Sequence, residues 1–464
     1  MTTEDKMRRR QFIGSMSVLA GAAGLPACGR AERAIPPASR EQKRPAGDAT
    51  LAGKPLAELR QDFERDLEEY VDFFIRHGID FENGGFMCGL DHDGVLVNAN
   101  KYLWFQGRGV WIFSRLYSWW KKEPRFLEIA QKTCDFMLKH FPQDPEGFRW
   151  ATWVARDGTV VTPYENDPFG CYFGIEGMFE LASATRDDKL REKALDLYIR
   201  HHRFVRDPAT RLGKYPPGTR GFNMEMADLQ IATQFLRGRD DERVRKIAAE
   251  CVDVIMNRYY NPEIKMFYEI LGPDLRVPKG WENQSNPGHN IEIMWMVMAE
   301  ARRAGDRALF NLAKERALES LEIGWDEIYG GVVAGVRVGE GCFEWPVLRV
   351  AGTSLEFRER GEYSYTKSHW SIGETLIATI TAFEDAGEEW ADRYFTKAKT
   401  VNEEKFSLRP HGYPLHLLFS DRKIAFTPHA TRKDNYHYMR ACILCMEAID
   451  RMIGSAKPER EIRG

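Results

Sequence analysis

Apolar residues recur along most of the chain at the spacing of helices that bury one face. From about residue 55, segments with apolar side chains at positions i, i+3, i+4 and i+7 follow one another with little interruption. This periodicity predicts twelve helices in six consecutive pairs. Their predicted ranges are 56–77, 101–120, 125–141, 166–185, 188–205, 221–236, 241–258, 287–304, 306–322, 367–386, 388–401 and 433–453.

Short β-like stretches with Gly and Asp-Gly turns separate the helix pairs and predict β-hairpins. They occupy residues 84–97, 148–161, 265–277, 330–341 and 407–426. A helix pair and a hairpin that repeat about six times are typical of a ring of paired helices. The sequence therefore predicts an all-α fold, an (α/α)6 barrel with short β-hairpins between the helix pairs. Two separate helical domains are the alternative.

The N-terminal segment differs from everything that follows it. Arg9 and Arg10 precede an uncharged apolar run, which is shorter than the roughly 20 apolar residues of a membrane-spanning helix. This pattern is typical of a twin-arginine export signal. Residues 25–29 resemble a lipoprotein box, in which Cys28 receives a lipid and becomes the first residue after cleavage. We therefore expect an exported protein, either periplasmic or anchored to a membrane only through this lipid.

The segment after Cys28 is rich in Pro, Ala, Arg and Lys, as in a flexible tether. We predict a signal peptide at 1–27, a tether at 28–51 and one catalytic domain at 52–464. Cys442 and Cys445 form a CxxC in the middle of a predicted helix, so we interpret them as core residues. The sequence shows no second cysteine pair at zinc spacing, and we expect no metal site.

Composition narrows the classes of function. The chain has 464 residues, 43% hydrophobic and 29% charged, as in a soluble globular protein. The formal net charge of -3 provides no broad positive field for phosphates, so we expect no nucleic-acid partner. Aromatic residues make up 12% of the chain, with 12 Trp among them, and sugar-binding clefts are one use for such rings.

Polar and aromatic residues gather at the starts of alternate predicted helices. In a ring of paired helices, these inner helices point their N-terminal ends into a central funnel, where polar ligands bind. Each residue taken singly has an ordinary structural interpretation, but together they predict a functional cavity. The candidates are Trp104, Arg108, Asn223, His289, Glu292, Trp295, Lys367, Trp370, Glu374, Tyr436, His437 and Arg440.

Several of these segments resemble one enzyme family. Residues 287–295, PGHNIEIMW, resemble the Pro-Gly-His-x-x-Glu-x-x-Trp motif of the N-acylglucosamine 2-epimerase family, which also includes cellobiose 2-epimerases and aldose-ketose isomerases. Residues 104–117, 370–374 and 433–442 resemble further segments of that family in the same order. The resemblance covers roughly residues 55 to 453. It implies an (α/α)6-barrel isomerase that acts on a small sugar without a cofactor.

The resemblance also implies roles for individual residues. His289 and His437 would be the acid and base, Arg108 would stabilise an oxyanion, and Glu292 and Glu374 would support them. Trp295 and Trp370 would be platforms for the sugar ring. The remaining predicted substrate contacts are Trp104, Asn223, Lys367, Tyr436 and Arg440.

Simple chemistry agrees with these roles. A carbon next to an aldehyde loses its proton without a cofactor when a base removes the proton and a cation holds the enolate oxygen. Histidine suits the base because its pKa of about 6.5 lies near neutral pH. Two histidines on opposite faces of C2 invert that centre. We expect Glu292, one helical turn after His289, to hold that ring in one tautomer.

Other functions stay open at this point. An aldose-ketose isomerase would return the proton to C1, although the sixth helix, beginning Asn223-Met-Glu-Met, lacks a histidine that isomerases and cellobiose epimerases of the family have. A glycoside hydrolase would need two carboxylates, such as Glu374 with Asp434 or Glu344. A non-catalytic sugar-binding lipoprotein would need neither histidine. We predict a carbohydrate 2-epimerase acting on a mono- or disaccharide, and leave a homodimer open.

Overall fold

The computed structural model describes residues 49–144, 149–165, 168–213, 215–279, 281–282, 284–337, 348–349, 356–357 and 366–454. The predicted signal peptide, Cys28, most of the tether and Glu344 lie outside the described residues. The chain divides into two compact units, Met1–Gln42 and Lys43–Gly464, and the fold below is that of the second unit.

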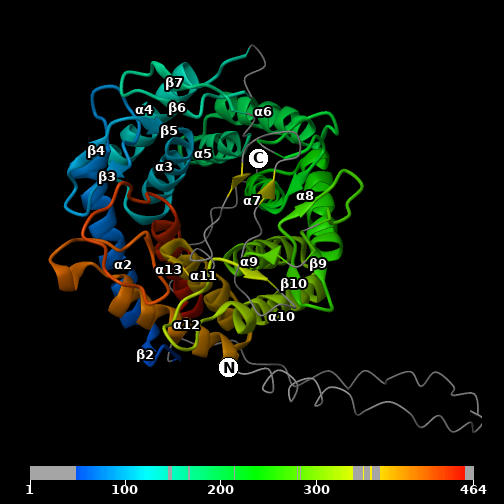
Figure 1. Cartoon of the computed structure of the whole chain (residues 1–464). Coiled ribbons are helices and arrows are strands. Elements are labelled where there is room, and N and C mark those ends of the chain that lie inside the picture. The colour runs from blue at the N-terminus through cyan, green and yellow to red at the C-terminus, as the bar shows by residue number, and fades with distance from the viewer. Residues whose placement is uncertain are drawn as a thin grey trace, which may run out of the picture. The chain divides into compact units, whose positions relative to one another are not determined.

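Twelve α-helices of the described chain form a ring of pairs (Figure 1). They are α2 (Leu56–Phe73), α3 (Leu103–Arg115), α4 (Pro124–His140), α5 (Phe169–Thr185), α6 (Asp188–Arg206), α7 (Phe222–Gly238), α8 (Glu242–Val254), α9 (Pro287–Ala304), α10 (Arg307–Gly324), α11 (His369–Ala386), α12 (Glu389–Val401) and α13 (His437–Met452). All twelve predicted helices are confirmed, with boundaries that shift by a few residues.

The helices form two concentric layers (Figure 1). Helices α3, α5, α7, α9, α11 and α13 pack side by side in chain order as the inner layer. Each outer helix packs mainly against one inner helix, and α2, the first helix, packs against α13, the last. This packing closes the ring and confirms the (α/α)6 barrel over the alternative of two helical domains.

Burial follows from these two layers. Inner helix α5 is buried at every position from Phe169 to Ala182, because it has neighbours on all sides. Outer helix α4 buries only one stripe of residues, which its apolar spacing predicted. Several helices continue into a π-helical turn, which accounts for the longer ranges predicted from the sequence. These turns are η1 (Phe74–Gly78), η2 (Leu116–Trp120), η3 (Ile255–Tyr259) and η5 (Asn402–Phe406), and a short 3-10 turn, η6 (Arg409–His411), follows the last of them.

The strands are two or three residues long and all pair antiparallel. They are β1 (Thr50–Leu51), β2 (Lys54–Pro55), β3 (Gly89–Leu90), β4 (Leu96–Asn98), β5 (Lys101–Tyr102), β6 (Trp153–Val154), β7 (Val160–Thr162), β8 (Arg220–Gly221), β9 (Tyr260–Asn261), β10 (Met266–Phe267), β11 (Ile270–Leu271), β12 (Gln284–Ser285), β13 (Val336–Arg337), β14 (Leu348–Arg349), β15 (Glu356–Phe357), β16 (Lys367–Ser368) and β17 (Phe419–Ser420).

Pairing of these strands agrees only in part with the predicted hairpins. Pairs β3–β4 and β6–β7 are the hairpins expected in 84–97 and 148–161. An antiparallel bridge between Ser407 and His416 lies within 407–426 as expected, whereas part of 330–341 lies outside the described residues. The hairpin expected within 265–277 is wrong, because its two strands, β10 and β11, do not pair with each other. Strands β11, β13 and β17 pair instead with strands of other connections, namely β8, β12 and β16. Each of these partners directly precedes an inner helix. The strands therefore tie the starts of α7, α9 and α11 to neighbouring loops.

Candidate functional site

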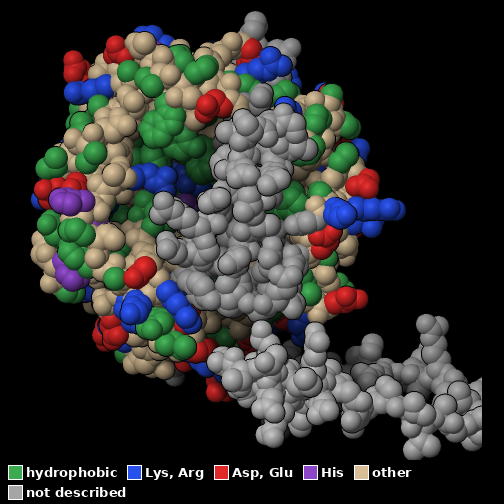
Figure 2. Space-filling model, in the orientation of Figure 1, with side chains coloured by type: hydrophobic (Ala, Val, Ile, Leu, Met, Phe, Trp, Pro, Cys, Tyr) green, Lys and Arg blue, Asp and Glu red, His purple; other side chains and the backbone are tan. Residues whose placement is uncertain are grey.

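The starts of the inner helices bring most of the predicted residues together around one hollow. On the side of α3 and α5, the visible wall of this hollow carries hydrophobic side chains and Lys or Arg side chains (Figure 2). Asn286 caps α9 by accepting hydrogen bonds from the backbone N–H groups of Gly288 and His289, with Pro287 at the first helical position. This cap places His289 in the first turn of α9. His437 is the first residue of α13.

Trp370 lies between the two histidines. Its ring centroid is 5.4 Å from that of His289 and 5.9 Å from that of His437, with interplanar angles of 34° and 40°. Trp370 is half-buried at the start of α11, so part of its surface faces the hollow. One indole ring therefore contacts both candidate acid-base groups, as a platform for a substrate between them would.

Glu269, and not the predicted Glu292, holds the His289 ring. His289 Nδ1 lies 2.9 Å from Glu269 Oε2, and Glu269 reaches it from the loop before β11. The expectation for Glu292 is wrong because its carboxylate accepts a hydrogen bond from Arg440. Burial lowers the pKa of His289, but the charge and hydrogen bond of Glu269 outweigh this and raise the pKa above its usual value.

His437 has a carboxylate partner of its own. Its Nδ1 lies 2.5 Å from Asp434 Oδ2, three residues before it. Burial lowers the pKa of His437; the charge of Asp434 opposes this, and the nearby Arg108 lowers the pKa further, so that it lies below its usual value. Burial would raise the pKa of Asp434, but His437 and Arg108 hold it well below its usual range. Asp434 is thus an ionised acceptor.

Both imidazole rings leave Nε2 without a hydrogen-bond partner in the part of the chain that the structure describes. Each uses Nδ1 for a carboxylate instead. The side chain of His289 is 26% exposed and that of His437 is 12% exposed, so both rings are reachable from the hollow. The environments of the two rings move their pKa values in opposite directions, which is the usual mark of a separate acid and base.

Arg440 is the centre of a buried polar cluster. Its Nη2 donates to Glu292 Oε1 at 2.7 Å and to Glu374 Oε1 at 2.6 Å. Its Nη1 donates to Gln230 and to the Tyr436 hydroxyl, each at 3.1 Å. The two carboxylates share this one cation. Burial and the charge of Glu292 raise the pKa of Glu374 to about 8, although Arg440 opposes them.

Trp295 and Glu176 complete this cluster. The indole N–H of Trp295 donates to Glu374 Oε2 at 2.8 Å, and the Tyr436 hydroxyl donates to Glu176 Oε1 at 2.9 Å. Burial raises the pKa of Glu176 to about 7. Sequence reasoning missed Glu176 and its hydrogen-bonded neighbour Gln230. The signal for Glu176 was a carboxylate within the otherwise apolar stretch Phe169 to Met178.

Arg108 has a very different environment. Its guanidinium carbon lies 3.9 Å from the ring centroid of Phe173, 4.9 Å from that of Tyr436 and 5.4 Å from that of Trp104. Its Nε is buried without a hydrogen-bond partner, and no carboxylate pairs with its guanidinium among the described residues. Burial lowers the pKa of Arg108, but an arginine stays charged. Arg108 is therefore a cation free to hold an oxygen of a ligand.

Glu292, Glu374 and His437 have potential metal-ligand atoms within 4.8 Å of one another. The two carboxylates, however, already accept hydrogen bonds from the Arg440 guanidinium. A second cation would repel this group at close range. The donor set therefore fits an arginine better than a metal ion.

Lys367 is not brought into the site, which corrects its predicted substrate contact. Its side chain has no exposure, and its Nζ donates to Asp326 Oδ2 at 3.0 Å and to the carbonyls of Gly330 and Arg422 at 2.8 and 3.1 Å. These bonds use all three donors of an ammonium group. Asn223 lies half-buried in the first turn of α7.

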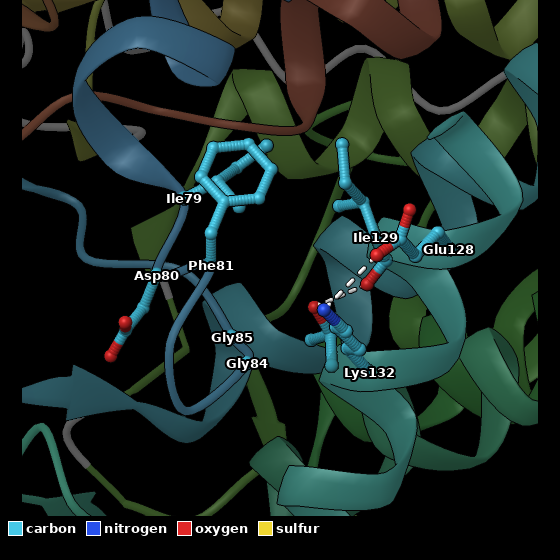
Figure 3. Close-up of a pocket in the computed structure, with 9 residues that line it drawn as sticks. Ile79, Asp80, Phe81, Gly84, Gly85, Glu128, Ile129 and Lys132 are labelled. Carbon is cyan, nitrogen blue, oxygen red and sulfur yellow. Dashed lines mark hydrogen bonds and ion pairs between the residues drawn. The ribbon is translucent and has the colours of Figure 1, made fainter.

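Lys101 repeats the arrangement of Lys367. Its Nζ donates to Asp80 Oδ2 at 2.9 Å and to the carbonyls of Gly84 and Arg156 at 2.6 and 2.7 Å. A matching Asp-x-x-x-Gly-Gly occurs at 80–85 and at 326–331, and was the sequence signal for both structural lysines. A shallow pocket beside the first copy is lined by Asp80, Gly84 and Lys132, and none of the predicted site residues lines it (Figure 3).

Comparison with known proteins identifies the family of this chain. The sequence profile of the N-acylglucosamine 2-epimerase (GlcNAc 2-epimerase) family matches residues 84–441. An N-acylglucosamine 2-epimerase of Mus musculus is 24% identical over 407 residues, which cover 85% of this chain and 93% of the relative. A cellobiose 2-epimerase of Dictyoglomus turgidum is 21% identical over 365 residues, which cover 71% of this chain and 82% of the relative.

Solved structures extend the likeness of the fold. A cellobiose 2-epimerase of Bacillus thermoamylovorans superimposes with a TM-score of 0.70 at 16% identity, covering 84% of this chain and 99% of the other. A family 76 α-mannanase of Bacteroides thetaiotaomicron superimposes with a TM-score of 0.55 at 10% identity, covering 84% and 96%. At these identities both likenesses concern the fold alone. From the match of its family profile over most of its length, this chain belongs to the N-acylglucosamine 2-epimerase family and is a carbohydrate epimerase, an enzyme of the isomerase class.

Proposed function

We propose that this protein is a cofactor-independent 2-epimerase of a free reducing sugar, with an N-acylated 2-amino sugar as its first candidate substrate. One observation carries the proposal: two histidines with free Nε2 atoms flank the ring of Trp370. The curated relatives that cover 85% of the chain are N-acylglucosamine 2-epimerases, which favours that sugar class. Cellobiose, the sugar named for more distant relatives, is the second candidate.

The reaction needs two proton transfers and one cation. Nε2 of one histidine removes the proton from C2 of the open-chain sugar, and the electron pair moves onto the C1 carbonyl oxygen. Arg108 holds the enolate oxygen, because its guanidinium has no competing carboxylate among the described residues. Nε2 of the other histidine then returns a proton to the opposite face of C2. The same pair opens the sugar ring by moving a proton from O1 to O5.

Deuterium exchange tests this proposal. The purified protein is incubated in deuterated water with N-acetylglucosamine, N-acetylmannosamine or cellobiose, and the products are read by NMR. We expect deuterium at C2 of at least one sugar, and its loss in His289→Ala and in His437→Ala. His429→Ala, which changes a histidine with an 81% exposed side chain, is the matched control and should exchange normally.

Other outcomes of this experiment identify the alternatives. A ketose product with deuterium at C1 would show an aldose-ketose isomerase. Cleavage of the cellobiose linkage would show a glycoside hydrolase. The absence of exchange with every sugar, or exchange that survives both histidine substitutions, would overturn the two-histidine proposal.

We also propose that the protein is exported, with residues 1–27 removed, a lipid on Cys28, a tether at 28–51 and a catalytic domain at 52–464. The support is the twin-arginine pattern and the lipoprotein-box resemblance. Within the described residues, none of the helices is long and apolar enough to cross a bilayer. Cell fractionation tests the proposal: Arg9→Lys with Arg10→Lys should retain the protein in the cytoplasm, and Cys28→Ala should release it from membranes.

The remaining partner proposals are narrower. We propose a small sugar as the ligand and no nucleic-acid partner, since the formal net charge is -3. A homodimer is the alternative to a monomer, and light scattering on the purified protein distinguishes the two.

A further inference from the structure

We propose that Glu269 and Asp434 are positioning residues, each of which anchors one histidine at Nδ1 and makes Nε2 the atom that exchanges protons on its side of the substrate. This inference rests on the proposed function, because it assigns roles within the same two-histidine reaction. It adds two residues that lie outside the recognisable motif at 287–295. It also gives both histidines the same arrangement, since each has one carboxylate at Nδ1.

The same geometry occurs twice. Glu269 accepts the backbone N–H of Asn286 on Oε1 at 3.2 Å and contacts His289 Nδ1 with Oε2 at 2.9 Å. Asp434 accepts the backbone N–H of Tyr436 on Oδ1 at 3.0 Å and contacts His437 Nδ1 with Oδ2 at 2.5 Å. Each carboxylate therefore joins the backbone just before an inner helix to the imidazole at the start of that helix.

This bridge determines the tautomer of each ring. An ionised carboxylate only accepts hydrogen bonds, so the Nδ1 that faces it must carry a proton. When the ring is neutral, Nε2 then carries the lone pair that removes a proton. When the ring is charged, Nε2–H is the donor, because Nδ1–H stays bound to the carboxylate. Both states use the same atom, as a reversible epimerisation requires.

The charges that face the two rings are unequal. His289 faces the acidic residues Glu269, Glu292 and Glu374, and mainly the charge and hydrogen bond of Glu269 raise its pKa above the usual value despite its burial. This balance favours the charged form of His289.

His437 has positive charge nearby as well. It faces Asp434, Glu292 and Glu374, but also Arg108. The buried His369 on α11 is near enough for the charge of His437 to lower the pKa of His369. Burial and Arg108 together lower the pKa of His437 below the usual value. These environments favour His437 as the base and His289 as the acid.

Substitution of each carboxylate by its amide tests the inference. An amide nitrogen also donates hydrogen bonds, so Asp434→Asn and Glu269→Gln no longer select one tautomer. We expect kcat to fall by roughly 100-fold to 10,000-fold, as when an orienting carboxylate of a histidine is lost, with little change in KM. Asp434→Glu should recover part of the kcat.

The pH profile separates a positioning role from a merely structural one. Loss of Asp434 lowers the pKa of His437, so the acid limb of kcat, where the base becomes protonated, moves to lower pH. Loss of Glu269 lowers the pKa of His289, so the alkaline limb, where the acid loses its proton, moves to lower pH. Asp91→Asn is the matched control, since Asp91 pairs with Nδ1 of the exposed His429 at 2.8 Å. It should move neither limb.

Nitrogen-15 NMR of histidine-labelled protein decides the inference without any substrate. Signals of the two rings are assigned by their loss in His289→Gln and His437→Gln. In the unsubstituted protein at neutral to alkaline pH we expect protonated Nδ1 on both rings, and in the amide variants a mixture of tautomers. Proton on Nε2 of the neutral rings, or tautomers and pH limbs that both stay unchanged in the variants, would overturn it. If the tautomers are as expected but no sugar exchanges, the proposed function fails instead.

Discussion

Arg440 and Arg108 are both buried guanidinium groups on inner helices and both lie over aromatic rings, yet only Arg440 pairs with carboxylates among the described residues. Arg440 contacts two carboxylates, an amide oxygen and a hydroxyl. Arg108 contacts the faces of three aromatic rings, and no carboxylate pairs with it in the described part of the chain, although Nε lacks a hydrogen-bond partner in both arginines. The rings hold the guanidinium by cation–π attraction, which leaves its N–H groups uncommitted.

The difference separates a cation that holds the site together from one that is available for chemistry. A buried charge is costly unless a group of opposite charge pairs with it, and Arg440 pairs with Glu292 and Glu374. Arg108 has no such partner among the described residues. Its burial therefore costs stability, which is common where a residue is kept for function. Three substitutions test this comparison.

Removal of Arg440 should have the largest effect on stability. Arg440→Met leaves Glu292 and Glu374 buried without their cation, and breaking a buried pair from one side typically costs about 3–5 kcal/mol. Chemical denaturation measures the loss in the free energy of unfolding. Adding Glu292→Gln and Glu374→Gln should recover part of it. A loss below about 1 kcal/mol in Arg440→Met would mean that the cluster does not hold the inner helices together.

Removal of Arg108 should act on the reaction and spare the fold. Arg108→Met should lower kcat about 100-fold or more, equivalent to roughly 3 kcal/mol, because the enolate oxygen loses its cation. The free energy of unfolding should change far less than in Arg440→Met, since Arg108 makes no ion pair with a carboxylate among the described residues. Arg108→Lys, which keeps the charge, should retain part of the activity. If Arg108→Met lost stability and kept its kcat, Arg108 would be a structural residue and the comparison with Arg440 would be wrong.

The third substitution, at Glu374, concerns how the stability of the fold varies with pH. Its pKa of about 8 in the folded protein lies above the usual carboxyl value of about 4.3. The folded state thus binds more protons than the unfolded state between these pH values, so stability falls as pH rises through this window. Glu374→Gln, which imitates the protonated acid, should flatten this decline, so that its stability relative to the parent protein rises from pH 5 to neutral pH.

Glu384→Gln is the matched control, because the pKa of Glu384 is shifted in the opposite direction from that of Glu374. Glu384 accepts hydrogen bonds from Arg451 and Arg302, and although burial raises its pKa, these arginines lower it below the usual value. It therefore stabilises the fold above the unfolded carboxyl pKa, and this contribution is lost as pH falls through its folded pKa. The glutamine variant should lose stability at neutral pH. Denaturant titrations from pH 5 to about 8.5 compare both variants with the parent protein.

The sequence by itself determined the helices and named the candidate reacting groups. Helix periodicity is local, since it needs only the spacing of apolar residues along one segment, and all twelve helices are where this spacing predicted them. Arg108, His289 and His437 were predicted because they lie at the starts of alternate helices, which a ring must bring together. The family resemblance at 104–117, 287–295 and 433–442 pointed to the same residues.

Only the tertiary structure decided which side chains meet. Glu269 contacts His289 from a different connection of the chain. Glu176 and Gln230 bond to each other and lie beside Tyr436, which belongs to the other end of the sequence. Lys367 binds Asp326 in the interior and does not point into the funnel. These contacts depend on how far each helix is rotated about its axis and on which loops cross its start. The spacing of residues within one segment carries no information on either. Periodicity therefore predicted the ring of helices, whereas only the three-dimensional structure shows which groups pair with its charged side chains.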